Sequence, residues 1–297
     1  MNRLPKPTGT VYRSDVWREC NTAALVLQAA GIEHEILRAA HGFVVVVAWT
    51  DTERAVLELD EYAREIQDVP PPPATLPQRS GGWYGVFVYA GVLLLITFLQ
   101  ARHTFSSDWF ASGLAGAGLI RDGQWWRTVT ALSLHTGMAH LVGNLVFGGL
   151  FGLFAGRLLG SGLAWASILA AGALGNAMNA WIQPLHHSSV GASTAVFGAL
   201  GLLSSVSWMQ RRGIEDGWIR RWTPIVGGVL LLGYTGTAGE RTDVIAHVTG
   251  FMSGLMLGAL YSALGRRKPM KAPAQFVLGS IALGAVAFCW LLALRSE

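Results

Sequence analysis

The feature that most constrains the fold of this sequence is a succession of long apolar segments from Trp83 to the C-terminus. A helix needs about 20 residues to cross the hydrocarbon core of a bilayer, where unpaired backbone groups are too costly to tolerate. We predict seven membrane-spanning helices, over residues 84–101, 137–157, 162–182, 193–210, 222–238, 243–264 and 275–294. The body of the chain is therefore predicted to be a polytopic α-helical membrane protein.

Charge is distributed unevenly along the chain. Charged residues make up 13% of the 297 positions, against about 25% in soluble proteins. Eleven of the 18 acidic residues precede Ser80. We therefore predict a small soluble N-terminal domain, residues 1–68, followed by a proline-rich linker, residues 69–82, that acts as an extended spacer.

The N-terminal domain alternates between strand and helix patterns. β-branched and alternating stretches predict strands, helical spacing that ends at Gly31 predicts the first helix, and an amphipathic charged stretch predicts the second. The predicted order is β-α-β-β-α, over residues 10–13, 20–30, 32–37, 43–49 and 51–66. This small α/β domain contains no evident catalytic constellation, and a peptide-binding, self-association or shielding role stays open.

The basic residues argue for membrane topology and against nucleic acid as a partner. The pI is about 9.3, but Lys and Arg occur in short clusters between apolar spans, and no basic face is evident. With the N-terminus inside, we count nine cations in the inner connections and five on the outer side. This bias follows the positive-inside rule. No apolar signal sequence follows Met1, so we expect the N-terminal domain on the cytoplasmic side.

One long connection and the two cysteines also bear on function. The connection over residues 102–136 carries several tryptophans and aliphatic residues, so we expect it to lie partly in the outer leaflet against the bundle. The only cysteines, Cys20 and Cys289, form no CxxC motif. Redox and zinc-thiolate roles are therefore not predicted.

Four polar residues fall within or beside apolar spans, where polar groups tend to mark function. Ser193 and His247 are candidates for a nucleophile and its general base, and the topology places both on the outer half of the bilayer. The Asn144 amide, the His140 ring and the Ser193 backbone amide are candidate donors for an oxyanion hole. Asp243 is more simply explained as a loop end, so we predict a Ser–His dyad.

Small residues provide a way for the serine and histidine helices to meet. Gly250, Gly254 and Gly258 follow His247 along one helix face, and such patterns allow membrane helices to approach closely. The pattern is common in membrane proteins, so it supports the pairing only together with the polar residues.

Across residues 84–265 the chain resembles the rhomboid intramembrane serine proteases. The matching residues, in order, are Trp126-Arg127, His135, His140 with Asn144, Gly191-x-Ser193, and His247 followed by Gly250. The resemblance implies Ser193 as nucleophile, His247 as base, and oxyanion donors from His140, Asn144 and the Ser193 amide. It also implies a gating fifth helix and single-span membrane proteins as substrates, cut near their outer end.

The resemblance divides the chain into a six-helix core, residues 83–265, and an additional transmembrane helix, residues 266–297. Thr194 departs from the family, which usually has glycine after the serine. A helical Thr194 would accept this change at little cost. Phe197 stands where the family often has tyrosine, and it keeps the ring against which the histidine stacks.

Several alternatives stay open at the level of sequence. A proteolytically silent relative that binds transmembrane helices would be expected to lose the serine or the histidine, and this chain keeps both. Each polar residue could instead have only a structural role, forming hydrogen bonds within or between helices. Four histidines could suggest a metal site, but no HExxH motif or carboxylate accompanies them, so neither a metal nor another cofactor is predicted. A transporter would have charged residues within several spans and a sequence repeat between its two halves, and neither is found in this sequence. The expected partners are transmembrane substrates and the lipid bilayer.

Overall fold

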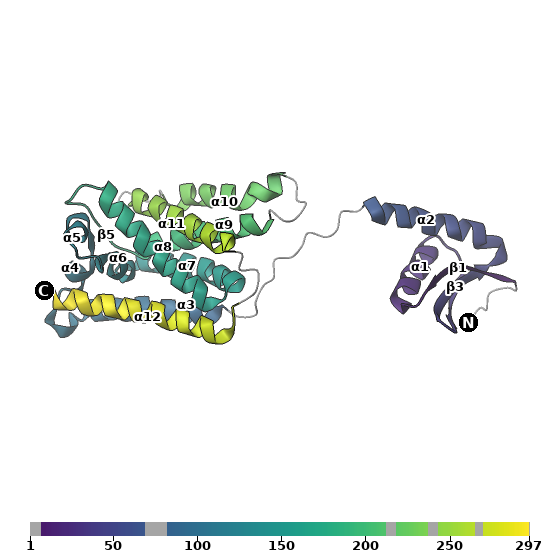
Figure 1. The fold of residues 1–297 in the computed structure, drawn as a ribbon, viewed down its shortest axis with the longest axis horizontal. Coiled ribbons are helices and arrows are strands. Elements are labelled where there is room, and N and C mark those ends of the chain that lie inside the picture. The colour runs from purple at the N-terminus through teal and green to yellow at the C-terminus, as the bar shows by residue number, and fades with distance from the viewer. Residues whose placement is uncertain (1–6, 69–81, 212–217, 237–242, 265–269, 297) are drawn as a thin grey trace. The chain divides into compact units, whose positions relative to one another are not determined.

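The computed structural model describes residues 7–68, 82–211, 218–236, 243–264 and 270–296. The chain divides into two compact units, Met1–Pro72 and Pro73–Glu297, and Figure 1 draws both. The predicted linker lies outside the described residues except for Gly82. Each unit is described by itself.

The N-terminal unit is a three-stranded antiparallel sheet with two helices. Its elements are β1 (Thr8–Ser14), α1 (Trp17–Ala29), β2 (His34–Ala39), β3 (Gly42–Ala48) and α2 (Thr52–Asp68). The strand order β1-β3-β2 puts the run of valines in the central strand. Val45 and Val47 are fully buried there, together with Cys20 and Leu27 of α1. The predicted α/β fold of this domain is confirmed.

The second unit contains seven long helices among its described residues, one at each predicted span. They are α3 (Trp83–Ala101), α7 (Met138–Leu159), α8 (Ser161–Ile182), α9 (Ser193–Arg211), α10 (Trp218–Gly236), α11 (Val244–Ala263) and α12 (Ala272–Arg295). Four of them, α3, α7, α11 and α12, are long and apolar enough to cross a membrane. The described apolar parts of α9 and α10 are shorter. The predicted polytopic helical fold is confirmed.

Helices α9 and α11 form the centre of the bundle and pack tightly on each other along their glycines. A Cβ atom on Gly254 would collide with the backbone oxygen of Gly198, and one on Gly250 would collide with that of Thr194. Only hydrogen fits between the two backbones at these positions. The predicted glycine contact is therefore what brings the serine and histidine helices together.

The connection between α3 and α7 is folded against the bundle. It contains three short helices, α4 (Trp109–Gly113), α5 (Ala117–Arg121) and α6 (Arg127–Thr130), two 3-10 turns, η2 (Thr104–Ser106) and η3 (Ala131–Ser133), and a two-residue strand, β4 (Ala115–Gly116). Strand β4 pairs with β5 (Ser188–Ser189), in the segment before α9. We refer to residues 102–136 as the first loop. Its contacts with α8 and α12 make it part of the folded core.

The C-terminal helix α12 covers α8 and the first loop, on the side of the bundle away from α10 (Figure 1). Trp290 is 4% exposed and packs against Trp109, with ring centroids 4.8 Å apart and the ring planes tilted by 39°. Its indole N–H donates to the Ser133 hydroxyl over 3.0 Å. The additional helix is thus joined to the first loop by both packing and a buried hydrogen bond.

Candidate active site

Ser193 and His247 lie within hydrogen-bond distance. Ser193 is the first residue of α9, and His247 lies in the first turn of α11. The distance from His247 Nε2 to Ser193 Oγ is 2.9 Å. The close glycine packing of α9 and α11 brings both helix starts to the same place. The pair has the geometry that a base needs to accept a proton from a hydroxyl.

One face of the His247 ring is covered by Phe197, one turn after Ser193. The two ring centroids are 4.5 Å apart, and the planes are tilted by 38°. Both side chains are buried. This contact restricts the rotation of the imidazole, so it helps to keep Nε2 directed at the serine.

The candidate oxyanion donors converge next to Gly191. This glycine has φ +127°, and a Cβ there would lie 2.6 Å from the His140 ring and 3.6 Å from Asn144 Nδ2. A side chain at this position would therefore displace His140. Asn144 is 6% exposed, and its Nδ2 has no hydrogen-bond partner among the described residues. Buried amides are rarely left unpaired, so this N–H group is available to an incoming oxygen.

These residues share one cavity with a volume of about 570 Å³. Its walls come from α7, the segment before α9, and the starts of α9 and α11. The lining includes His140, Asn144, Ser193, Phe197 and His247. One hollow therefore contains a hydroxyl, an imidazole beside it and a free amide donor, the three parts that acyl transfer requires.

His135 and the pair Trp126-Arg127 do not line this cavity. The His135 ring packs edge-on against the His140 ring, with centroids 5.1 Å apart. Burial, with a smaller contribution from His140, lowers the pKa of His135 to about 4. The ring is therefore neutral at pH 7, and it packs against the His140 ring without lining the cavity.

Arg127 holds the first loop together. It is 7% exposed, and its Nη1 donates to the carbonyls of Ala111 and Leu114 over 2.9 and 3.0 Å. Its Nε donates to the Gln124 side chain over 2.6 Å. Trp126, beside it, is packed with the residues of α3 and α12 that surround Trp109. Arg127 and Trp126 therefore stabilise the first loop and its packing against the bundle, and they do not line the cavity.

Known proteins share this core. A family model described as the rhomboid domain matches residues 122–264. The chain is 30% identical over 212 residues to rhomboid-like protein 11, chloroplastic, of Arabidopsis thaliana, covering 63% of this chain and 68% of that protein. The chain belongs to the rhomboid family.

Two bacterial relatives of this rhomboid are named as proteases. The chain is 32% identical over 187 residues to the rhomboid protease GluP of Bacillus subtilis (strain 168), covering 61% of this chain and 35% of that protein. It is 26% identical over 141 residues to the putative rhomboid protease YdcA of the same organism, covering 48% and 69%. This rhomboid therefore spans about a third of the length of GluP. With its apolar helices, it is an integral membrane protein.

The side chain of Thr194 is accommodated because its methyl group packs against two glycines, Gly175 and Gly250. It lies inside α9, and among the described non-glycine residues only His103 and Phe105 have positive φ. A Cβ on Gly175 would lie 2.7 Å from the Thr194 methyl, and one on Gly250 would lie 3.0 Å from it. The departure from the family glycine is thus accommodated by missing side chains on α8 and α11, and the backbone at Thr194 carries no left-handed strain.

Asp243 forms a network that the sequence does not reveal. Its Oδ2 lies 2.7 Å from His187 Nε2 and accepts from Asn179 over 2.8 Å. Its Oδ1 accepts from the Ala246 amide over 3.0 Å and so caps α11. Both carboxylate oxygens are therefore engaged away from His247. An aspartate just before a helix is a recognised start signal, but its partners on α8 and the segment before α9 are set by the fold.

The network favours the ionised form of Asp243. Burial alone would raise its pKa, but the hydrogen bonds from His187, the Ala246 amide and Asn179 outweigh burial, and the net pKa is lowered. A lowered folded-state pKa contributes stability above the usual carboxyl pKa, and that stability is lost as pH falls through the lowered value. The network therefore ties the segment before Ser193 to the start of the His247 helix throughout the neutral range.

Replacing Asp243 by asparagine is expected to destabilise the fold by about 2 kcal/mol, because charge-assisted hydrogen bonds are lost and one amide N–H faces other donors. The thermal unfolding midpoint in detergent measures the effect. Asp122, an exposed residue of the first loop, provides the matched control, and Asp122→Asn should leave the midpoint unchanged. Equal unfolding midpoints for the two variants would contradict a stabilising role for the Asp243 network.

Proposed function

We propose that this protein is an intramembrane serine protease that hydrolyses peptide bonds in transmembrane segments of membrane-protein substrates. The observation that carries the proposal is the 2.9 Å separation of Ser193 Oγ and His247 Nε2 in a cavity that also holds an unpaired Asn144 amide. Membership of a family whose relatives are named as proteases supports the same reaction.

In the proposed acylation step, Ser193 Oγ attacks the carbonyl carbon of the scissile bond while its proton passes to His247 Nε2. The negative charge on the carbonyl oxygen is stabilised by Asn144 Nδ2, a His140 ring N–H and the Ser193 backbone amide. The amide at the first position of a helix has no partner within the helix, so it is free to donate. His247 then gives its proton to the leaving amine as the peptide bond breaks.

In the proposed deacylation step, water replaces the leaving amine. His247 accepts a proton from the water, the resulting hydroxide attacks the acyl carbon, and the ester bond to Ser193 breaks as His247 returns the proton to Oγ. The same donors serve both steps because the oxyanion forms in the same place. The enzyme ends each cycle with a neutral imidazole and a serine hydroxyl.

The substrate segment must unwind before this chemistry can occur. A peptide bond within a helix has its carbonyl hydrogen bonded and its carbon enclosed by side chains. Segments with small or helix-breaking residues near the membrane surface therefore match a site located at the helix starts of α9 and α11. We place that site toward the outer side of an inner membrane, with the N-terminal domain cytoplasmic.

A fluorophosphonate probe tests the nucleophile directly, since it reacts only with an activated serine. We expect the purified full-length protein to be labelled and to cut a single-span substrate, and we expect Ser193→Ala to lose both properties. Ser207→Ala changes a serine on the same helix outside the cavity and should keep both. Absence of labelling in the folded wild-type protein would instead favour a silent relative that binds transmembrane helices.

A further inference from the structure

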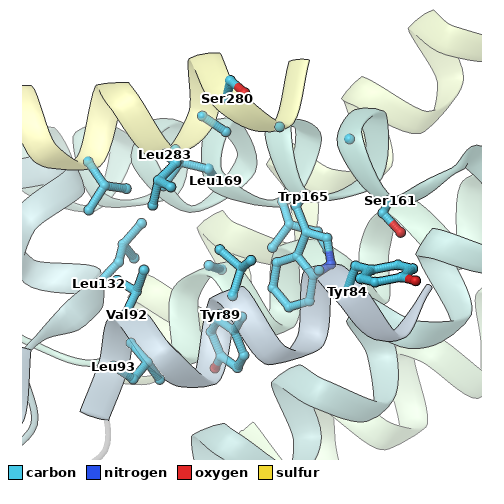
Figure 2. A pocket seen from close by; sticks show the side chains of 18 of the residues that line it. Tyr84, Tyr89, Val92, Leu93, Leu132, Ser161, Trp165, Leu169, Ser280 and Leu283 are labelled. Carbon is cyan, nitrogen blue, oxygen red and sulfur yellow. The ribbon is translucent and has the colours of Figure 1, made fainter. Parts of the chain in front are cut away.

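A second cavity of about 540 Å³ lies between α3, α8 and α12. Figure 2 shows side chains of these helices directed into it, among them Leu93, Trp165 and Leu283. Its volume lies within the roughly 300–1,000 Å³ of small-molecule sites. None of the residues that line the Ser193 cavity lines this one.

The cavity exists because α12 and α3 are held by different neighbours. Helix α12 packs mainly on α8, whereas α3 packs mainly on α7. The space between them is open to the surroundings of the bundle, and two α12 residues at its edge, Phe276 and Leu283, are 77% and 46% exposed. In a membrane-spanning bundle these surroundings are lipid, so the occupant must enter from the bilayer.

The length of the cavity matches one leaflet. Along α12 the lining runs from Gln275 to Val286, a rise of about 16 Å at 1.5 Å per residue. Half of the hydrocarbon core is about 15 Å thick. A lipid acyl chain aligned with the helices would therefore fill the cavity from one end to the other.

The lining is mostly apolar, and three of its polar residues lie at one end; Ser280 lies farther along α12, and the Ser133 hydroxyl is already hydrogen bonded to Trp290 and Thr130. Leucine, valine and alanine side chains dominate the middle, while Tyr84, Ser161 and Gln275 lie where α3, α8 and α12 begin. Figure 2 labels the first two of these at one edge of the cavity, with the aliphatic residues at the other. This gradient is that of a lipid, with a polar head and an apolar tail.

Two basic residues, Arg157 and Lys271, belong to the helix ends next to the polar end. Gln275 donates to the carbonyl of Leu159 over 2.8 Å, which places it beside the last turn of α7, where Arg157 lies. Lys271, the cap of α12, is one turn before Gln275. The sequence contains no Asp or Glu between Asp122 and Glu215, so no acidic side chain from α7 or α8 offsets these cations.

We propose that this cavity is a binding site for an anionic phospholipid, with one acyl chain between α3 and α12 and the phosphate near Arg157 and Lys271. The apolar volume selects a hydrocarbon chain over a polar metabolite, and the two cations select a negatively charged head group over a zwitterionic one. The seventh helix forms the wall that a six-helix bundle would lack. The lipid proposal does not rest on the proposed protease reaction, although Ala192 and Ala195, which flank Ser193 and Thr194, also line this cavity.

Native mass spectrometry of the purified full-length protein tests the site. Phosphatidylglycerol and phosphatidylcholine with identical acyl chains are titrated separately, so that the head group is the only difference. We expect phosphatidylglycerol to bind at least about tenfold more tightly, and Arg157→Gln or Lys271→Gln each to weaken it about fivefold, as expected for one cation near a lipid head group.

A pair of tryptophan substitutions on α12 tests the cavity itself. Leu283 lines it, whereas Ile281 is 61% exposed and does not. Leu283→Trp is expected to fill the space and weaken phosphatidylglycerol binding at least about tenfold, and Ile281→Trp should leave binding unchanged. Elution volume and thermal midpoint verify that both variants are folded.

Three results would overturn the proposal. The first is equal binding of the two phospholipids, and the second is equal binding by the two tryptophan variants. The third is unchanged binding after loss of either cation, a result that does not depend on how well Leu283→Trp folds. Labelling of Ser193 by a fluorophosphonate is scored separately, so failure of the lipid site is distinguishable from failure of the protease proposal.

Discussion

Replacing His247 by glutamine is expected to lower the rate of substrate cleavage by about 10³-fold or more. Glutamine retains a polar side chain of similar length but cannot accept the Ser193 proton, and general-base catalysis contributes roughly 10²–10⁴-fold. The Ser193 hydroxyl remains in place but is no longer activated. Cleavage of a single-span substrate in proteoliposomes measures the loss, and fluorophosphonate labelling should fall with it.

His186 provides the matched control for this experiment. It is exposed in the segment before α9 and does not line the Ser193 cavity, so His186→Gln should cleave at the wild-type rate. If the His247 variant cleaved as fast as this control, His247 could not be the base. If the His247 variant lost cleavage but was still fully labelled, His247 would not be needed to activate Ser193, and its role would lie in a later step of cleavage.

Replacing Gly254 by leucine is expected to destabilise the bundle by about 3 kcal/mol or more, at the upper end of overpacking costs. The new Cβ would occupy the position of the Gly198 backbone oxygen, and a backbone cannot move aside as a flexible side chain can. Helices α9 and α11 would have to separate, which would also separate Ser193 from His247. Thermal unfolding and cleavage should therefore fail together.

Gly284 on α12 controls for the general effect of a leucine in a membrane helix. A Cβ at Gly284 would meet no atom within 4 Å, so Gly284→Leu should leave both the unfolding midpoint and cleavage near wild type. Similar losses of stability and cleavage in the two variants would indicate a general effect of leucine in a membrane helix. The close approach of α9 and α11 would then not explain the effect of Gly254→Leu.

The fold was predictable wherever a single segment decides its own structure. An apolar stretch must be a helix in lipid, so the seven helices lie at the predicted spans, and the strand and helix patterns of residues 8–68 are equally local. The short helices of the first loop are different. Their arrangement depends on contacts such as that of Arg127 with the carbonyl of Ala111, which no local pattern encodes.

The candidate site shows the same division. Ser193, His140 and Asn144 are conspicuous as polar residues among apolar ones, so sequence alone draws attention to them. The pairing of Asp243 with His187 and Asn179 joins residues 56 and 64 positions apart, and nothing in their local sequence indicates it. Sequence also treats Thr194 as a departure, because the glycines that receive its methyl group lie on two other helices.

The hydrogen bond between Trp290 and Ser133 has a consequence for the biosynthesis of the protein. The two residues are 157 positions apart, so at roughly 5–20 residues per second the first loop leaves the ribosome about 8–31 s before the helix that covers it. During that interval the Trp109 side chain has no Trp290 ring beside it. The loop therefore completes its packing only after the last helix has inserted, and a nascent chain interrupted before Trp290 would present an uncovered aromatic surface to the machinery that inserts and inspects membrane proteins.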